Sequence, residues 1–151
     1  MQWKPNVTVA AIVERENRFL LVEEEADGLV VFNQPAGHLE ENETLFDAVR
    51  REVLEETAWE YEPHSLVGVY MYPNPHQDIT YLRFCFAGTA VRHHPDRELD
   101  REIIRTVWLD RDEVRELENR LRSPMVLRCI NDYLDGVQHP LELLHHYLEK
   151  T

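Results

Sequence analysis

The sequence is poor in cysteine and has no segment that would divide it. Cys85 and Cys129 are its only cysteines, too few for a disulfide framework and not a spaced set of metal ligands. Residues 84–86 form an apolar run around Cys85, so we expect both thiols to be buried and free. No Gly/Ser linker, internal repeat or low-complexity tract occurs. The length of 151 residues therefore fits one domain over residues 1–151.

Positive charge is also scarce. The 16 Lys and Arg residues face 29 Asp and Glu residues, which gives a net charge of −13. Proteins bind nucleic-acid polymers by neutralising phosphates with Lys and Arg, so we expect no such polymer as a partner. A small phosphorylated molecule can still bind, provided that a metal ion or a local arginine offsets the charge.

Long hydrophobic runs are absent as well. No apolar stretch approaches the ~18 residues needed to span a membrane. The N-terminal residues lack the basic and then apolar order of a signal peptide. We therefore expect a cytoplasmic protein with no membrane partner. Apolar residues nevertheless make up 43% of the chain, which is enough for a folded core.

The hydrophobic pattern changes its period along the chain. β-Branched and aromatic residues predict strands over residues 7–13, 18–23, 29–33, 66–72, 80–91 and 104–109. Helical spacing and capping residues predict helices over residues 44–57, about 111–118, about 123–134 and, as a short terminal helix, 141–149. Residues 16–17 and 27–28 are turn signals, and residues 34–38 have the chemistry of a loop. This order predicts an α+β domain whose central mixed β-sheet is covered by helices on both sides.

Three carboxylates share one face of the first predicted helix. Glu52, Glu55 and Glu56 are three or four residues apart, so their side chains project together. Glu52 and Glu56 repel each other at a cost of about 0.2–0.5 kcal/mol. Negative charge in the last turn also opposes the helix dipole, at about 0.3–1 kcal/mol per residue. A divalent cation would reverse these costs, because Mg²⁺ binds carboxylate oxygens; a solvated acidic face is the alternative interpretation.

The residues around this face match a longer pattern. Gly37 is followed after five residues by Glu43 and, after seven more, by the run Arg-Glu-Val-Leu-Glu-Glu over residues 51–56. This pattern resembles the Nudix box, the loop, helix and loop that mark the Nudix hydrolase family, and it implies a Nudix-like α/β/α sandwich. One position departs from it. Ala58 stands where the family usually has glycine just past the helix, and a left-handed conformation there costs alanine about 1 kcal/mol.

The resemblance also implies a site and its cofactor. It assigns the binding of one or more Mg²⁺ ions, with Mn²⁺ as a possible replacement, to three side chains and one carbonyl group: Glu52, Glu55, Glu56 and the carbonyl of Gly37. Arg51 would orient the carboxylates by pairing with Glu43. The loop ahead of the strand predicted over residues 104–109 is expected to add a catalytic acidic ligand or general base. Three acids of that loop are candidates, and the last is favoured: Glu98, Asp100 and Glu102.

The implied reaction is attack of a metal-bound water on a diphosphate linkage. Residues 33–40, 121–124 and 139–142 are similar to the NudJ-type phosphatases of the family. That similarity suggests a nucleoside di- or triphosphate, or a pyrimidine diphosphate of thiamine metabolism, as substrate. The candidates for substrate binding are an arginine for the phosphate, an amide for the edge of a ring and two aromatics for stacking: Arg83, Gln34, Phe32 and Tyr81. An outward-facing charge for the arginine and core positions for the aromatics are the alternatives.

Other classes of protein explain the sequence less well. A catalytically inactive ligand-sensing module with the same fold is the main alternative, favoured by Ala58 and opposed by the complete set of glutamates. A di-iron carboxylate protein would need paired Glu-x-x-His motifs, and Glu52 and Glu55 are followed by none. A purely structural domain leaves the uncompensated carboxylates unexplained. The sequence is compatible with a monomer or a homodimer.

Overall fold

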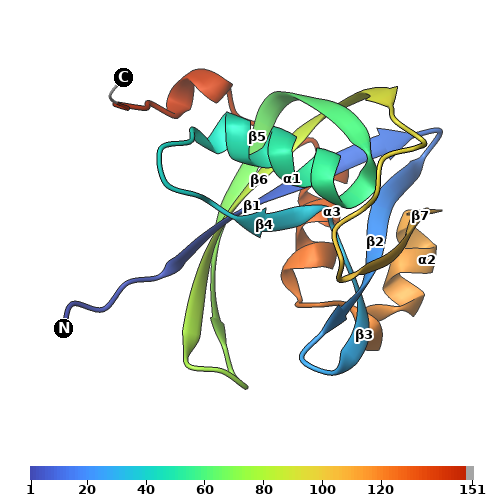
Figure 1. The fold of residues 1–151 in the computed structure, drawn as a ribbon, viewed down its shortest axis with the longest axis horizontal. Helices are drawn as coiled ribbons and strands as arrows, with labels where there is room; N and C mark the ends of the chain where they lie inside the picture. Colours follow the sequence, from blue (N-terminus) through green and yellow to red (C-terminus); the bar gives the residue numbers. More distant parts are fainter. Residues whose placement is uncertain (149–151) are drawn as a thin grey trace.

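Strand β1 (Asn6–Arg15) is the strand along which the central sheet divides. In the computed structural model, which describes residues 1–148, most of β1 pairs in parallel with β6 (Ile79–His93). On its other edge β1 pairs first with the short strand β4 (Ala36–His38), antiparallel. Only its last two residues pair with β2 (Arg18–Ala26). The sheet therefore splits into two halves, one with β4 and β6 and one with β2, which diverge from the C-terminal end of β1 (Figure 1).

Each half of the sheet is completed by further strands. β5 (Trp59–Asn74) pairs with β6 in a long hairpin that extends away from the body of the molecule (Figure 1). β3 (Leu29–Asn33) and β7 (Ile103–Leu109) pair with the two edges of β2. The turns that enter and leave β2 have two central residues with positive φ, as the right-handed twist of a hairpin requires. The predicted turns at residues 16–17 and 27–28 are thereby confirmed.

Helices cover both faces of the sheet, as predicted. α1 (Leu45–Thr57) begins after Thr44, whose Oγ1 accepts a hydrogen bond from the Asp47 N–H at 3.0 Å. Its apolar side is buried against β1 and β5. α3 (Met125–Leu134) packs against the opposite face. The short helix α2 (Arg111–Glu116) starts with a capping box at Asp110 and leads to α3 through a 3₁₀ turn, Glu118–Arg120.

One predicted strand boundary and one predicted loop are wrong. β5 begins at Trp59, well ahead of residue 66, although it contains Pro63. The register of β5 against β6 shifts between Pro63 and Ser65, and such an irregularity accommodates a residue that has no N–H to donate. Residues 36–38, expected as part of a loop, form β4, because a strand of three residues is too short to give a periodic pattern.

The predicted terminal helix over residues 141–149 does not form within the described part of the chain. Leu141–Leu143 make one 3₁₀ turn and residues 144–148 are not helical, while residue 149 lies outside the described range. The His146 ring instead accepts a hydrogen bond from the Leu45 N–H at 3.1 Å, at the start of α1. Both cysteines are buried and free, as expected. Between residues 1 and 148, no helix has the length and apolar character needed to cross a membrane.

Candidate active site

The last two turns of α1 carry three glutamates, and two of them, Glu52 and Glu56, lie against β4. Glu52 and Glu56 are buried and Glu55 is half-buried. The Ala36 N–H donates a hydrogen bond to Glu56 Oε1 at 2.9 Å. The carboxylate of Glu52 lies so close to Gly37 that a Cβ added to the glycine would be 2.1 Å from Glu52 Cδ. β4, the short strand that was not predicted, therefore positions the carboxylates of Glu52 and Glu56.

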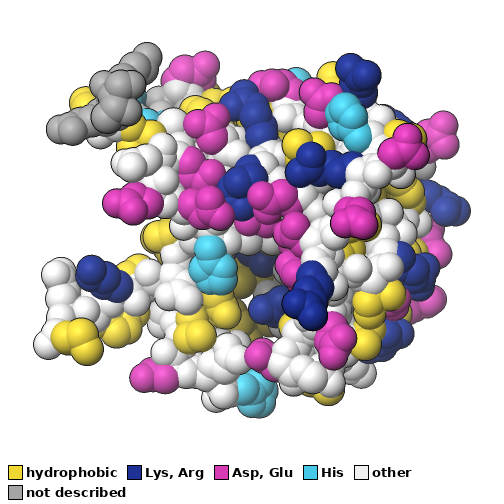
Figure 2. Space-filling model, in the orientation of Figure 1, with side chains coloured by type: hydrophobic (Ala, Val, Ile, Leu, Met, Phe, Trp, Pro, Cys, Tyr) yellow, Lys and Arg dark blue, Asp and Glu magenta, His cyan; other side chains and the backbone are white. Residues whose placement is uncertain are grey.

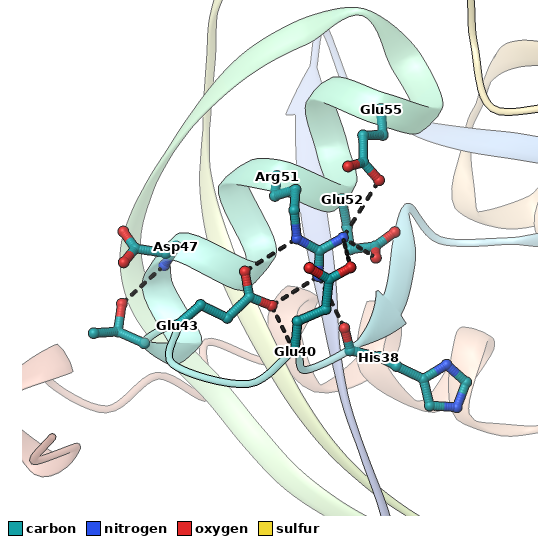
Figure 3. Close-up of polar contacts among 8 residues, drawn as sticks. His38, Glu40, Glu43, Asp47, Arg51, Glu52 and Glu55 are labelled. Carbon is teal, nitrogen blue, oxygen red and sulfur yellow. Dashed lines mark hydrogen bonds and ion pairs between the residues drawn. The ribbon is translucent and has the colours of Figure 1, made fainter. Parts of the chain in front are cut away.

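Arg51 links the surrounding acidic side chains (Figure 3). Its Nε and Nη2 donate to the two oxygens of Glu43 at 3.0 and 2.8 Å, the pairing expected from the sequence. Its Nη1 donates to Glu52 Oε1 at 2.7 Å and to Glu55 Oε2 at 3.3 Å, and Nη2 also reaches the His38 carbonyl at 2.9 Å. The hydrogen bond with Glu43 and then that with Glu52 raise the pKa of Arg51. One cation thus holds several carboxylates in place without neutralising them all.

A loop from outside the box adds further carboxylates. Backbone hydrogen bonds connect this loop to α1 and to β2. The Asp100 N–H donates to the Glu55 carbonyl at 2.9 Å, and the Glu25 N–H donates to the Glu102 carbonyl at 3.0 Å. Two sets of carboxylate oxygens then lie within 4.8 Å of one another: Glu52, Glu55 and Asp100; Glu56, Asp100 and Glu102. Asp100 belongs to both sets, whereas the sequence favoured Glu102. No local pattern encodes a hydrogen bond between this loop and the end of α1.

The site is short of positive charge. Burial raises the pKa of Glu52 to about 7 in spite of the hydrogen bond from Arg51. Burial also raises the pKa of Glu56 well above its ordinary value, and the nearby negative charges, with Glu24 the strongest, add to the effect. The pKa of Asp100 is raised by burial and then by Glu55. Since a divalent cation replaces protons on such ligands, the donor set and its electrostatics fit a hard metal ion.

A cavity of about 860 Å³ opens in front of these carboxylates, between the two halves of the sheet. Figure 2 shows acidic side chains across the middle of this face and a hollow in the surface below them. Away from the acidic end, the lining includes Leu29 and Val31 from β3 and Tyr72 and Tyr81 from the β5–β6 hairpin. The volume is that of a site for a small organic molecule.

The residues expected to bind substrate divide into two groups. Tyr81 and Arg83 line the cavity. The alternative interpretation of Arg83 as an outward-facing charge is wrong, because only 4% of the residue is exposed. Gln34 and Phe32 are not among the lining residues. Gln34 is buried beneath Arg83 and accepts its hydrogen bond, and Phe32 is buried with its ring 4.9 Å from the Arg120 guanidinium.

An ion pair that the sequence analysis did not predict lies in the cavity wall. Arg122 donates from Nη1 to Glu24 Oε1 at 2.8 Å, although the two residues are 98 positions apart. Glu24 is 4% exposed. The backbone N–H of Arg122 also donates to the Phe32 carbonyl at 2.8 Å, so the segment before α3 is fixed to β3. The only signal was the position of Arg122 within residues 121–124, which resemble the NudJ-type phosphatases.

The fold and the acidic site define an α+β hydrolase domain, and comparisons with known proteins identify its family. The family model of the NUDIX domain matches residues 4–129. Phosphatase NudJ of Escherichia coli (strain K12) is 39% identical over 142 residues, which cover 94% of this chain and 92% of that protein. The chain belongs to the Nudix family and is a Nudix hydrolase.

Solved structures agree with this assignment. A NUDIX hydrolase from Nitrosomonas europaea has 46% sequence identity and a TM-score of 0.94, covering 95% of this chain and 98% of its own. A MutT protein from Methanosarcina mazei Go1 has 23% identity and a TM-score of 0.71, covering 90% of this chain and 99% of its own. The second likeness is one of fold alone. The predicted Nudix-like sandwich is confirmed.

Ala58 adopts the left-handed conformation that the family's glycine would favour, with φ 61° and ψ 19°. Ala58→Gly would relieve about 1 kcal/mol of backbone strain but would lose a buried methyl group worth about 0.8 kcal/mol. We expect the free energy of unfolding in urea to change by less than about 1 kcal/mol. The hydrolysis rate should stay within about twofold of the parent. A large gain in rate would mean that Ala58 limits catalysis.

Proposed function

We propose that this Nudix hydrolase uses Mg²⁺, with Mn²⁺ as an alternative ion, to cleave a diphosphate linkage in a small phosphorylated molecule. The observation that carries the proposal is the junction at Asp100, where carboxylates from α1 and from a distant loop come within 4.8 Å of one another. A purely structural acidic surface has no reason to collect buried carboxylates with raised pKa values. The name of the NudJ relatives, phosphatase, supports the same class of reaction.

The roles of the residues follow from their contacts. Glu52, Glu55, Glu56 and the Gly37 carbonyl would hold the metal ions. When bound, the metal lowers the pKa of a coordinated water and neutralises charge on the phosphoryl oxygens. Arg51 keeps the carboxylates of Glu52 and Glu55 oriented, and the Ala36 N–H fixes one oxygen of Glu56. Glu102, the exposed member of its set, would accept the proton of the attacking water as general base, with Asp100 as the alternative.

The substrate class is inferred more coarsely. We favour a nucleoside di- or triphosphate or a pyrimidine diphosphate, as the resemblance of residues 33–40, 121–124 and 139–142 to the NudJ-type phosphatases implies. The cavity supports this choice, since its acidic end suits metal-bound phosphates and Tyr81 offers a ring for stacking at the other end. An inactive sensing module is disfavoured because the whole carboxylate set and its positioning arginine are present.

The proposal is tested by measuring release of phosphate and pyrophosphate from a panel of nucleotides and pyrimidine diphosphates. Each compound is assayed with Mg²⁺, with Mn²⁺ and in EDTA. Release that depends on the metal would support the hydrolase and rank its substrates. Failure of a folded protein to release either product, although calorimetry shows that it binds Mg²⁺, would favour the sensing module.

Without metal, the stability of the protein should depend on pH through Glu52. The pKa of this carboxyl is raised from 4.5 to about 7, so the folded state binds more protons than the unfolded state between these values. Stability is therefore lost as the pH rises from about 5 to about 8. The melting temperature in EDTA, compared between the parent and Glu52→Gln across this range, should fall further in the parent, because the variant keeps only the raised pKa values of Glu56 and Asp100. An identical pH profile for the two proteins would contradict it.

Added Mg²⁺ should reverse the loss. Metal ions bind the ionised carboxylates of the folded state, so the rise in melting temperature on adding Mg²⁺ should be larger at pH 8 than at pH 5. The same titration with Glu52→Gln should give a smaller rise at both pH values. An equal rise at both pH values in the parent would argue that Mg²⁺ binds elsewhere.

A further inference from the structure

Arg83 brings a positive charge into the cavity that the protein does not neutralise. The residue is 4% exposed. Its Nη1 donates to Gln34 Oε1 at 2.7 Å and its Nη2 to Asn33 Oδ1 at 3.5 Å, and both acceptors are neutral amides. Its Nε is buried and has no hydrogen-bond partner, and the guanidinium is close enough to the buried Cys129 thiol to lower the pKa of that group. Arg83 takes part in none of the ion pairs found within residues 1–148.

The surrounding hydrogen bonds maintain this state. Glu24, a buried acid of the same cavity wall, is already paired with Arg122 at 2.8 Å. Asn33 donates from Nδ2 to Glu24 at 3.4 Å, which turns its Oδ1 toward Arg83. Gln34 donates from Nε2 to the Ala11 carbonyl at 3.4 Å, which likewise leaves its Oε1 for Arg83. The guanidinium is thus held in position by amides while its charge stays available.

A second polar group faces the same space. Thr8 lies opposite Arg83 in the register of β1 against β6 and also lines the cavity. Its Oγ1 is buried and has no hydrogen-bond partner. A buried charge without a counter-charge and a buried hydroxyl without a hydrogen bond both cost folding free energy. Arg83 and Thr8 therefore do not stabilise the protein in the absence of a ligand. An anionic oxygen between them would satisfy both, with a charge-assisted hydrogen bond from Arg83.

This pair is adjacent to the carboxylate site but separate from it. Gln34, which supports Arg83, is two residues ahead of Ala36, whose N–H holds Glu56. Two residues of extended chain span about 7 Å. One ligand that carries two linked phosphate groups could therefore reach both the metal-binding carboxylates and Arg83.

We infer that Arg83 and Thr8 form an anion subsite for a phosphate group of the substrate that the metal ions do not hold. The inference rests on the proposed function for the identity of the ligand, a small organic molecule with at least two linked phosphates. Arg83 is then a specificity-determining residue, which selects such a molecule over a simple phosphate monoester. The subsite itself requires no metal, and this property allows a separate test.

The first experiment measures binding without metal or turnover. In the variant Glu52→Gln/Glu55→Gln/Glu56→Gln the carboxylates that bind metal and repel anions are neutral, and Gln at position 56 can still accept the Ala36 N–H. Isothermal titration calorimetry in EDTA, with inorganic pyrophosphate as probe, should detect weak binding to this variant. Adding Arg83→Gln should lower the affinity at least about tenfold.

The matched control adds Arg105→Gln to the same background. Arg105 lies on β7, is paired with Glu23 and is not among the cavity-lining residues, so this variant loses one positive charge elsewhere. Its pyrophosphate affinity should equal that of the background. Circular dichroism checks that each variant is folded. Absence of pyrophosphate binding in the folded background, or equal affinity with and without Arg83→Gln, would overturn the subsite.

The second experiment uses the native carboxylates and the best substrate of the panel. Arg83→Gln should raise KM at least about tenfold with a smaller change in kcat, Arg83→Lys should be intermediate, and Arg105→Gln should match the parent. If no substrate is turned over, the proposed function fails while the calorimetry still tests the subsite. A raised KM without any pyrophosphate binding would overturn the phosphate assignment, since Arg83 would then contact the organic part of the substrate.

Discussion

Glu56→Gln is expected to lower kcat by about a thousandfold, which corresponds to about 4 kcal/mol of lost transition-state stabilisation. The substitution removes the negative charge of the deeply buried Glu56 carboxylate but keeps the shape of the side chain. Glu56 is 4% exposed and accepts the Ala36 N–H at 2.9 Å, and the amide oxygen of a glutamine can accept the same bond. The loss would therefore fall on metal binding and turnover rather than on the fold.

Stability provides the discriminating measurement for this variant. Ionised Glu56 is repelled by Glu24, Glu52 and Asp100, so a neutral side chain at position 56 should leave the melting temperature in EDTA unchanged or higher. Glu41→Gln is the matched control, because Glu41 is exposed and does not line the cavity; its rate should equal that of the parent. A Glu56→Gln enzyme that keeps a rate near the parental one would remove Glu56 from the metal site. A marked loss of stability would instead show that the glutamate is a structural residue.

Much of the fold could be predicted because the signals are local. The turns at residues 16–17 and 27–28 are formed by residues that accept positive φ, and they fix the pairing of β2 with its neighbours. Thr44 caps α1 by a contact over three residues. The shared face of Glu52, Glu55 and Glu56 follows from helical geometry alone. Each of these features depends only on residues close together in sequence.

The remaining parts of the site depend on contacts between distant segments. Asp100 reaches the carboxylates because its loop is hydrogen-bonded to the last turn of α1, and β4 exists because β1 turns away from β2 and leaves an edge free. Gln34 was expected to contact substrate, yet the structure buries it beneath Arg83. Residue type alone does not tell a polar side chain that meets the ligand from one that supports its neighbour. That distinction is set by tertiary packing.

Gly37→Ala should lower kcat by about a hundredfold, because it displaces Glu52, one carboxylate of the proposed metal site, without unfolding the protein. The added Cβ would lie 2.1 Å from Cδ and 2.3 Å from both oxygens of Glu52. All three atoms belong to the mobile end of a side chain, so Glu52 can turn away and the backbone need not shift. The melting temperature should change by no more than a few degrees, whereas the affinity for Mg²⁺, measured by calorimetry, should fall.

A double-mutant cycle separates this explanation from a direct role of the glycine. In Glu52→Ala the side chain that the new Cβ would strike is absent, so adding Gly37→Ala should have little further effect on kcat or on Mg²⁺ affinity. A further large loss in the double variant would mean that Gly37 acts through its own backbone, as the carbonyl ligand that we propose. Glycine would then be required for the backbone conformation of β4, and not to leave room for the Glu52 carboxylate. Non-additivity in the cycle therefore shows whether this glycine acts by leaving room for a carboxylate.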